Sequence, residues 1–297
     1  FAQRYAAGAS FEVANGSLPA QVVDSARLTE SGIDLAQLMQ KFLYGAVAYS
    51  QAAGDYLSPD LGPTKGINAS NTEVYSPGAN ATKLEHHWDE AFGYFAAPTA
   101  ALDYTNEQFV KNYSVDTNAD GVIDLFTEKS YITMRNAAYL ETRASSQDFE
   151  LVESLFRSFV QGRELITKEP ANYREYLDDS AVVALSLWEK SIAGVCVKYI
   201  NSTISEMNEF GTEDYLFSNH AKYWSELKGY CLAFQFNPKS MLTRDGFIKL
   251  HDLIGNAPVL AGQSSSAEYQ NYIDGLLQAR DLIRDVYGFK QEDVEKF

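Results

Sequence analysis

The chain has 297 residues, of which 45% are hydrophobic and 22% charged, a balance typical of a soluble globular protein with a substantial core. Its 24 basic and 40 acidic residues give a net charge of −16, which disfavours binding to nucleic acid or anionic lipid and attracts cations. No run approaches the roughly 18 apolar residues of a transmembrane helix, so the sequence predicts no membrane span.

The first part of the chain alternates between irregular and helical patterns. Residues 1–31 contain several turn-forming breaks and predict loops with one short helix. Apolar residues then recur at three- and four-residue steps from Ile33 to near Gly54, which predicts a helix. Residues 55–80 are rich in Pro, Gly, Asn and Ser and predict a long loop, and loops of this length are often functional.

The helix predicted over residues 83–95 (KLEHHWDEAFGYF) concentrates chemically active side chains. His86 lies four residues from Glu90 and His87 lies three, so each imidazole shares a helical face with that carboxylate. An apolar stripe toward a core is formed by Leu84, Trp88, Ala91 and Phe95. Helical bundles build metal and ligand sites from such combinations, so these three polar residues are candidate ligands. The alternative is that they are ordinary polar side chains.

A seven-residue pattern, Trp-x-Glu-x-x-Gly-Tyr, occurs twice in the chain. Chance agreement of three residue types at fixed offsets from two tryptophans is improbable, which favours a duplicated helical half. A third pair, Trp188-Glu189, lies on another helical run, and Glu189 and Glu226 could join Glu90 inside a bundle. Alternatively, the pattern only packs helices. The two copies are Trp88, Glu90, Gly93 and Tyr94, and Trp224, Glu226, Gly229 and Tyr230.

The sharpest motif is DTNADGVID at residues 116–124, which has the offsets of an EF-hand-type calcium loop. Oxygen donors on alternate residues of a tight turn converge on one hard cation, and Gly121 permits the turn. Thr127 stands where an EF-hand has its bidentate Glu, so we expect Glu128 or a more distant carboxylate to complete the shell. The alternative is a metal-free turn. The expected ligands are Asp116, Asn118, Asp120, the Val122 carbonyl, Asp124 and Glu128.

The rest of the chain predicts an all-α fold, a helical bundle built from two packed halves. One half would span residues 1–168, with the His-His helix and the calcium loop, and the other residues 169–297, with the second copy of the repeat. Zinc-helix, nucleophile-elbow, phosphate-loop and CxxC motifs do not occur. Cys196 and Cys231 could pair or could remain buried free thiols. The predicted helices cover 104–113, 130–143, 149–169, 173–207, 214–235, 247–253 and 269–286.

Four segments in this order resemble an uncharacterised domain family of bacterial exported lipoproteins: KLEHHWDEAFGYF, DTNADGVID, LWEKSIAG at 187–194 and HAKYWSELKGY at 220–230. His87-x-x-Glu90 also resembles the GxHxxE signature of imelysin-like proteins, with Glu85 replacing the glycine. Those are all-α, two-bundle periplasmic or surface proteins, once classed as metallopeptidases and linked to iron uptake. The resemblances imply an imelysin-like fold and a periplasmic, outer-membrane-anchored or extracellular protein whose signal region preceded Phe1.

The favoured function is a non-catalytic, extracytoplasmic metal-binding protein, associated with iron uptake if the imelysin resemblance holds, with a structural calcium ion. His86, His87, Glu90 and Glu226 would bind a transition metal such as Fe, Zn or Mn, or a metal-bearing small ligand. The expected partner is an envelope or outer-membrane protein. One alternative is a structural or interaction module whose signature residues only pack. The other is an imelysin-type metallopeptidase with Glu90 as base, which the divergent directions of adjacent histidines on a helix disfavour.

Overall fold

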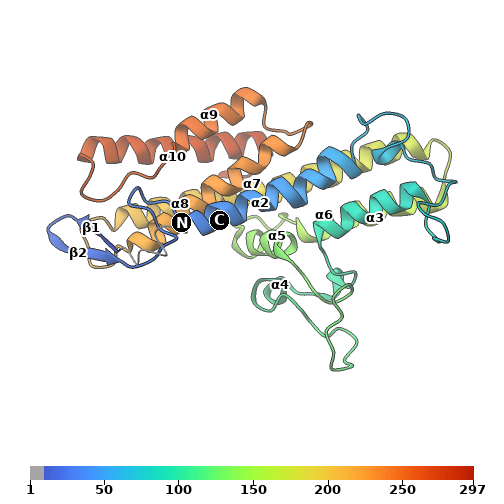
Figure 1. Ribbon diagram of the computed structural model, residues 1–297, viewed down its shortest axis with the longest axis horizontal. Coiled ribbons are helices and arrows are strands. Elements are labelled where there is room, and N and C mark those ends of the chain that lie inside the picture. Colours follow the sequence, from blue (N-terminus) through green and yellow to red (C-terminus); the bar gives the residue numbers. More distant parts are fainter. Residues whose placement is uncertain (1–9) are drawn as a thin grey trace. The chain divides into compact units, whose positions relative to one another are not determined.

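The computed structural model describes residues 10–297 and is mostly helical, which confirms the predicted fold class in its broad form (Figure 1). Helices α3, α4 and α10 each begin with a capping box, in which a Ser or Thr N-cap and a Glu or Gln three residues later satisfy each other's backbone groups. The α-helices are α2 (Leu35–Leu43), α3 (Lys83–Phe95), α4 (Asn106–Lys111), α5 (Ile132–Arg143), α6 (Val152–Lys168), α7 (Tyr173–Asn208), α8 (Phe217–Cys231), α9 (Arg244–Ile254), α10 (Ser266–Tyr287) and α11 (Gln291–Val294).

The chain divides into two compact units that are interleaved in sequence. Unit 1 comprises the N-terminal stretch to Tyr44, Ala193–Gln235 and Met241–Phe297, and unit 2 comprises Gly45–Ile192 and Phe236–Ser240. This division differs from the predicted consecutive halves, 1–168 and 169–297. Helix α6 and the first part of α7 belong to the same unit, so Pro170 marks the turn between two helices and not a boundary between units.

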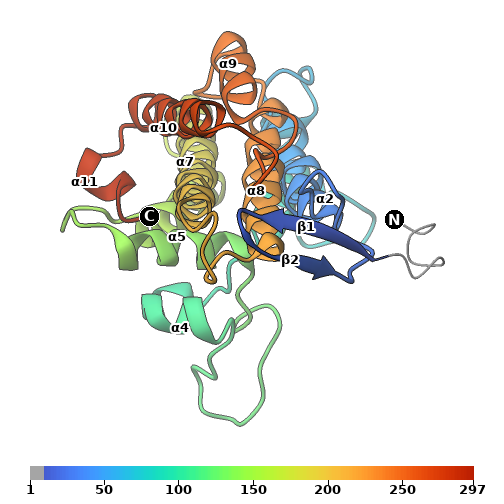
Figure 2. The ribbon, with the colours of Figure 1, turned by 90° about the vertical axis from the view of Figure 1, so that its left-hand side faces the viewer.

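A β-hairpin near the N-terminus corrects the all-α prediction, which had placed loops and a short helix there. Strands β1 (Phe11–Asn15) and β2 (Leu18–Val23) pair antiparallel, with Gly16 at a positive φ of 61° in the turn (Figure 2). Val13 and Val23 pack in one cluster with Tyr215 and Phe217 near the start of α8. Such short strands depend on this long-range packing, which a local pattern does not reveal.

The helix predicted from Ile33 to Gly54 is present, but its second half is π-helical. Helix α2 passes into the π-helices η1 (Tyr44–Tyr49) and η2 (Ala52–Tyr56). π-Helical segments are rare and occur frequently at functional sites. In unit 2 they deliver Tyr49 to the buried Glu189 carboxylate, at 2.8 Å, and Tyr56 to the ring of His87.

Helices α3 and α6 lie side by side in unit 2 (Figure 1). The predicted stripe of Leu84, Trp88, Ala91 and Phe95 is buried, as expected. Trp88 donates its indole N–H to the Phe159 carbonyl at 2.9 Å, and Gly162 leaves room for the indole, because a Cβ there would lie 1.9 Å from it.

Among the described helices, α7 alone has the length and mean hydropathy that a membrane span would require. Of its most apolar window, 67% is buried inside the protein, as in the core helix of a soluble protein. The absence of a membrane span stays a prediction.

Candidate functional site

His87 on α3 is held by a single backbone acceptor. Its Nδ1 lies 2.8 Å from the carbonyl oxygen of Gly66, in the short 3₁₀ helix η3 (Gly66–Asn68). A carbonyl can only accept, so the Nδ1 proton is donated to it and, in the neutral ring, Nε2 carries the free lone pair. Gly66 has a φ of 55°, and a Cβ there would lie 1.9 Å from the Ser58 carbonyl oxygen, so only glycine can present its carbonyl in this way.

His86 and Glu90 share the more exposed side of the same helix. The His86 ring stacks on Tyr75 at 4.2 Å and 11°, and its Nδ1 lies 3.9 Å from Glu90 Oε1. The two side chains are 33% and 41% exposed. The imidazole and the carboxylate are therefore neighbours at the surface, beyond direct hydrogen-bond distance.

Two tyrosines that the sequence did not predict, Tyr56 and Tyr75, complete this group of side chains around His86 and His87. Tyr56 packs edge-on against His87 at 5.8 Å and stacks on Tyr94, also at 5.8 Å. Burial, followed by the charge of Glu90, raises the pKa of the Tyr56 hydroxyl. Tyr56 comes from a π-helix and Tyr75 from the long loop, so no local spacing links either residue to α3.

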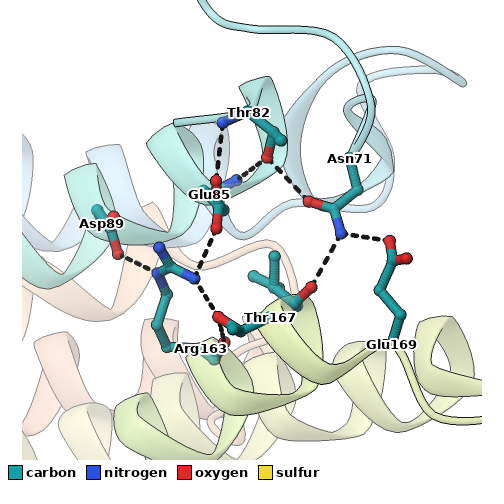
Figure 3. Close-up of polar contacts among 8 residues, drawn as sticks. Asn71, Thr82, Glu85, Asp89, Arg163, Thr167 and Glu169 are labelled. Atoms are coloured by element: carbon teal, nitrogen blue, oxygen red, sulfur yellow. Dashed lines mark hydrogen bonds and ion pairs between the residues drawn. The ribbon is translucent and has the colours of Figure 1, made fainter. Parts of the chain in front are cut away.

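A neighbouring side of α3, which carries Glu85 and Asp89, is fixed by Arg163 of α6 (Figure 3). Its guanidinium contacts the Glu85 carboxylate at 3.0 Å and the Asp89 carboxylate at 2.9 Å, and it donates to Thr167 at 2.6 Å. The backbone N–H of Thr82 and the Arg163 charge lower the pKa of Glu85. Glu85, which replaces the glycine of the imelysin signature, thus serves the capping box and this inter-helix ion pair.

Beside these contacts, α3 and α6 form an open apolar groove of about 690 Å³ that sequence reasoning did not find. Its lining includes Phe92, Phe156, Val160 and the Trp88 indole. The residues come from two helices whose packing had to be known first.

The other candidate carboxylates have protein partners. Glu226 belongs to unit 1 and lies 3.3 Å from Lys41 Nζ, while its Oε2 has no hydrogen-bond partner in the described part of the chain. Glu189, in unit 2, is fully buried and accepts hydrogen bonds from Tyr49, Asn237 and Ser240. Both glutamates therefore belong to local polar contacts.

The two copies of the repeat make different contacts. Trp88 lies in unit 2 and Trp224 in unit 1, and Trp224 donates its indole N–H to Tyr272 at 2.8 Å. A Cβ on Gly229 would lie 2.8 Å from the Leu38 carbonyl oxygen, so this glycine permits the close approach of α2. Gly93 has open space around its Cβ position. Tyr94 stacks on Tyr56, Tyr230 stacks on Tyr199 at 5.9 Å, and the Trp188 ring packs against Phe95 at 5.4 Å.

The loop at residues 116–128 is shaped by its own acidic side chains. Asp116 accepts from the backbone of Asp120 and Gly121, Asn118 accepts from Asp120, and Asp120 accepts from Val122 at 2.8 Å. Gly121 has the positive φ, 83°, that the sharp turn requires. Asp124 accepts from the N–H groups of Phe126 and Thr127, and these bonds lower its pKa, that from Thr127 contributing most.

The carboxylate that turns into this loop belongs to Glu128, the residue after Thr127. Its side chain is 1% exposed, with Oε1 accepting from the Thr117 and Asn118 backbone and Oε2 from Asp124 N–H at 3.1 Å. These hydrogen bonds, that from Asp124 contributing most, lower the pKa of Glu128. Across the described residues 10–297, no group of three His, Cys, Asp or Glu side chains is arranged to hold a metal ion as it stands.

Fold and site together define a mostly helical protein with an acidic turn and a cluster of imidazole, phenol and carboxylate groups. Residues 12–247 match the domain of unknown function DUF4856, so the chain belongs to that family. The expected kinship with an uncharacterised domain family is thereby confirmed. No curated protein and no solved structure matches the chain.

Proposed function

We propose that this protein is a non-catalytic calcium-binding protein of the bacterial envelope, periplasmic or outer-membrane-anchored. The buried Glu128 carboxylate carries the proposal, because it turns into the loop of the DxNxDG turn, where it accepts from the Thr117, Asn118 and Asp124 N–H groups. We propose that it takes the role of the bidentate glutamate of an EF-hand. Asp116, Asn118, Asp120, the Val122 carbonyl and Asp124 would supply the remaining oxygens. Calcium would also relieve the repulsion among four carboxylates within one short loop.

Calorimetry on chelator-stripped protein tests this proposal. We expect one calcium ion per chain, with Asp120→Asn weakening the affinity at least tenfold, about 1.4 kcal/mol. Asp103→Asn is the matched control, because Asp103 is an exposed aspartate outside the loop. Absence of calcium binding, or equal affinity in the two variants, would refute the assignment.

A second site for a transition metal, or for a metal-bearing ligand, is proposed at His86, His87 and Glu90. It is supported by the bond from His87 Nδ1 to Gly66, because metal-binding histidines generally donate their other ring N–H to a carbonyl or carboxylate. Only two imidazoles and one carboxylate are available, so a small ligand would have to supply further donors. Glu226 is paired with Lys41 and is not needed for this site.

Elemental analysis after loading with Fe, Zn or Mn tests the second site. Metal should be retained by the wild type and lost in His87→Gln, while His86→Gln separates the contributions of the two imidazoles. Equal metal content in wild type and His87→Gln would remove this site and leave the calcium proposal intact.

A structural or interaction module is the competing function, and one observation favours it. Val122, Leu125 and Phe126 expose 67%, 64% and 82% of their surface within the acidic loop, and grouped exposed apolar residues mark interaction sites. This candidate predicts that Phe126→Ser abolishes capture of an envelope protein while calcium affinity is kept. Unchanged capture would exclude the loop as the contact.

An imelysin-like fold and an imelysin-type metallopeptidase activity remain the more specific proposals. They rest on His87 and Glu90 lying three residues apart on α3. A catalytic metal of this type needs about three protein ligands and an open position for water. Chelator-sensitive cleavage of a protein substrate, lost in Glu90→Gln, would support this alternative over a binding protein.

A further inference from the structure

The only two cysteines of the chain meet inside unit 1. Cys196 lies on α7 and Cys231 is the last residue of α8, and both are fully buried. Burial, followed by the neighbouring Cys231 side chain, raises the pKa of the Cys196 thiol, so the two thiols are close neighbours. Nearby, Tyr199 stacks on Tyr230 at 5.9 Å and 16°, so the two helices are in direct contact at this level.

We propose that Cys196 and Cys231 form a disulfide that links α7 to α8 when the protein folds in the presence of a disulfide-bearing oxidant. Because α7 and α8 are in contact beside both cysteines, through the stacked rings of Tyr199 and Tyr230, side-chain rotations can bring the two sulfur atoms within bonding distance. The thiolate of one cysteine attacks the oxidant and releases one thiol, and the second cysteine then displaces the other. Two S–H bonds are replaced by one protein S–S bond, and the two electrons and two protons leave with the two oxidant thiols.

Burial determines when this reaction can occur. Both side chains are 0% exposed, so an oxidant reaches them only before the helices close. Burial also raises the pKa of the Cys196 thiol well above its ordinary value, which disfavours the nucleophilic thiolate in the folded protein. A cross-link would therefore form during folding and resist reduction afterwards. The inference does not depend on the proposed calcium site.

Oxidative refolding of the full chain tests the proposal. Reduced, denatured protein is refolded with oxidised and reduced glutathione, denatured again with a maleimide and weighed by mass spectrometry. We expect no maleimide adduct, against two adducts for protein refolded under reducing conditions. The oxidised protein should melt roughly 5–10 °C higher, because the bond closes a loop of about 35 residues. It should resist dithiothreitol until denaturant is added.

Cys231→Ala provides the matched control, and it should give either one maleimide adduct or one glutathione adduct per chain. Two free thiols in oxidatively refolded wild type would overturn the proposal, as would glutathione on both cysteines or disulfides between chains. The number of maleimide adducts on the wild type tests the disulfide even if the Cys231→Ala variant folds poorly.

Discussion

Acidification should destabilise the protein through a histidine that is buried without a charge partner. His220 on α8 is fully buried, its Nδ1 pairs with the Tyr215 hydroxyl at 3.2 Å, and its Nε2 has no hydrogen-bond partner in residues 10–297. The ring of Phe210 packs against it at 5.4 Å. Burial lowers the pKa of His220 to about 4 from an ordinary value of 6.5.

The sign of the effect follows from this lowered pKa. The unfolded chain binds the proton near pH 6.5 and the folded chain only near pH 4, so stability is lost as the pH falls through this window. At pH 5, protonation of His220 alone stabilises the unfolded state relative to the folded state by about 2 kcal/mol. His251 acts in the same direction, because burial and then the Lys228 charge lower its pKa to about 4, but it is only partly buried and adds less.

Urea unfolding at pH 7 and pH 5 measures the difference. Between these two values the wild type should lose about 2 kcal/mol more than His220→Gln, since all carboxylates titrate equally in both proteins. Equal losses would show that His220 does not govern the acid response. The ring can also be followed by NMR in the wild type, where its signals at pH 5 should have moved by only about a tenth of their full titration shift.

Four further substitutions test helix packing and the ion pairs between α3 and α6 by urea unfolding. Gly229→Ala should cost about 1–3 kcal/mol, because its Cβ would lie 2.8 Å from the Leu38 carbonyl oxygen, and a neutral result would refute the close approach. Gly93→Ala should instead stabilise by about 0.5–1 kcal/mol, because its Cβ meets open space, and destabilisation would contradict this. Arg163→Met should cost about 1 kcal/mol through its two partly exposed ion pairs, with Glu85→Gln alone costing less, and no loss in Arg163→Met would show that the pairs contribute nothing.

Sequence reasoning succeeded where contacts are local. The stripe on residues 83–95 follows from helical spacing, and the structure buries its four members. Helices α5 to α10 were likewise found from their apolar spacing, whereas the four-residue helix α11 was not predicted.

Sequence reasoning failed where segments distant in the chain determine the surroundings of a side chain. The two copies of the repeat are alike in sequence, yet only Gly229 meets a neighbouring helix, because α2 crosses α8 there and no helix approaches Gly93 within reach of a Cβ. Tyr56 and Tyr75 reach α3 from a π-helix and a loop, and the β1–β2 hairpin depends on packing near the start of α8.

The acidic loop shows both outcomes within one motif. Its turn residues and the glycine at a positive φ follow from the DxNxDG offsets. Whether Glu128 would turn inward was not decided by the sequence, because its burial depends on backbone donors at Thr117, Asn118 and Asp124.

The most direct test of the proposed function is the number of calcium ions bound by chelator-stripped protein, titrated by calorimetry. One ion per chain for the wild type, with Glu128→Gln at least tenfold weaker, is the result expected if the buried carboxylate completes the shell. No binding, or binding that Glu128→Gln leaves unchanged, would contradict the proposal and leave 116–128 as a metal-free turn.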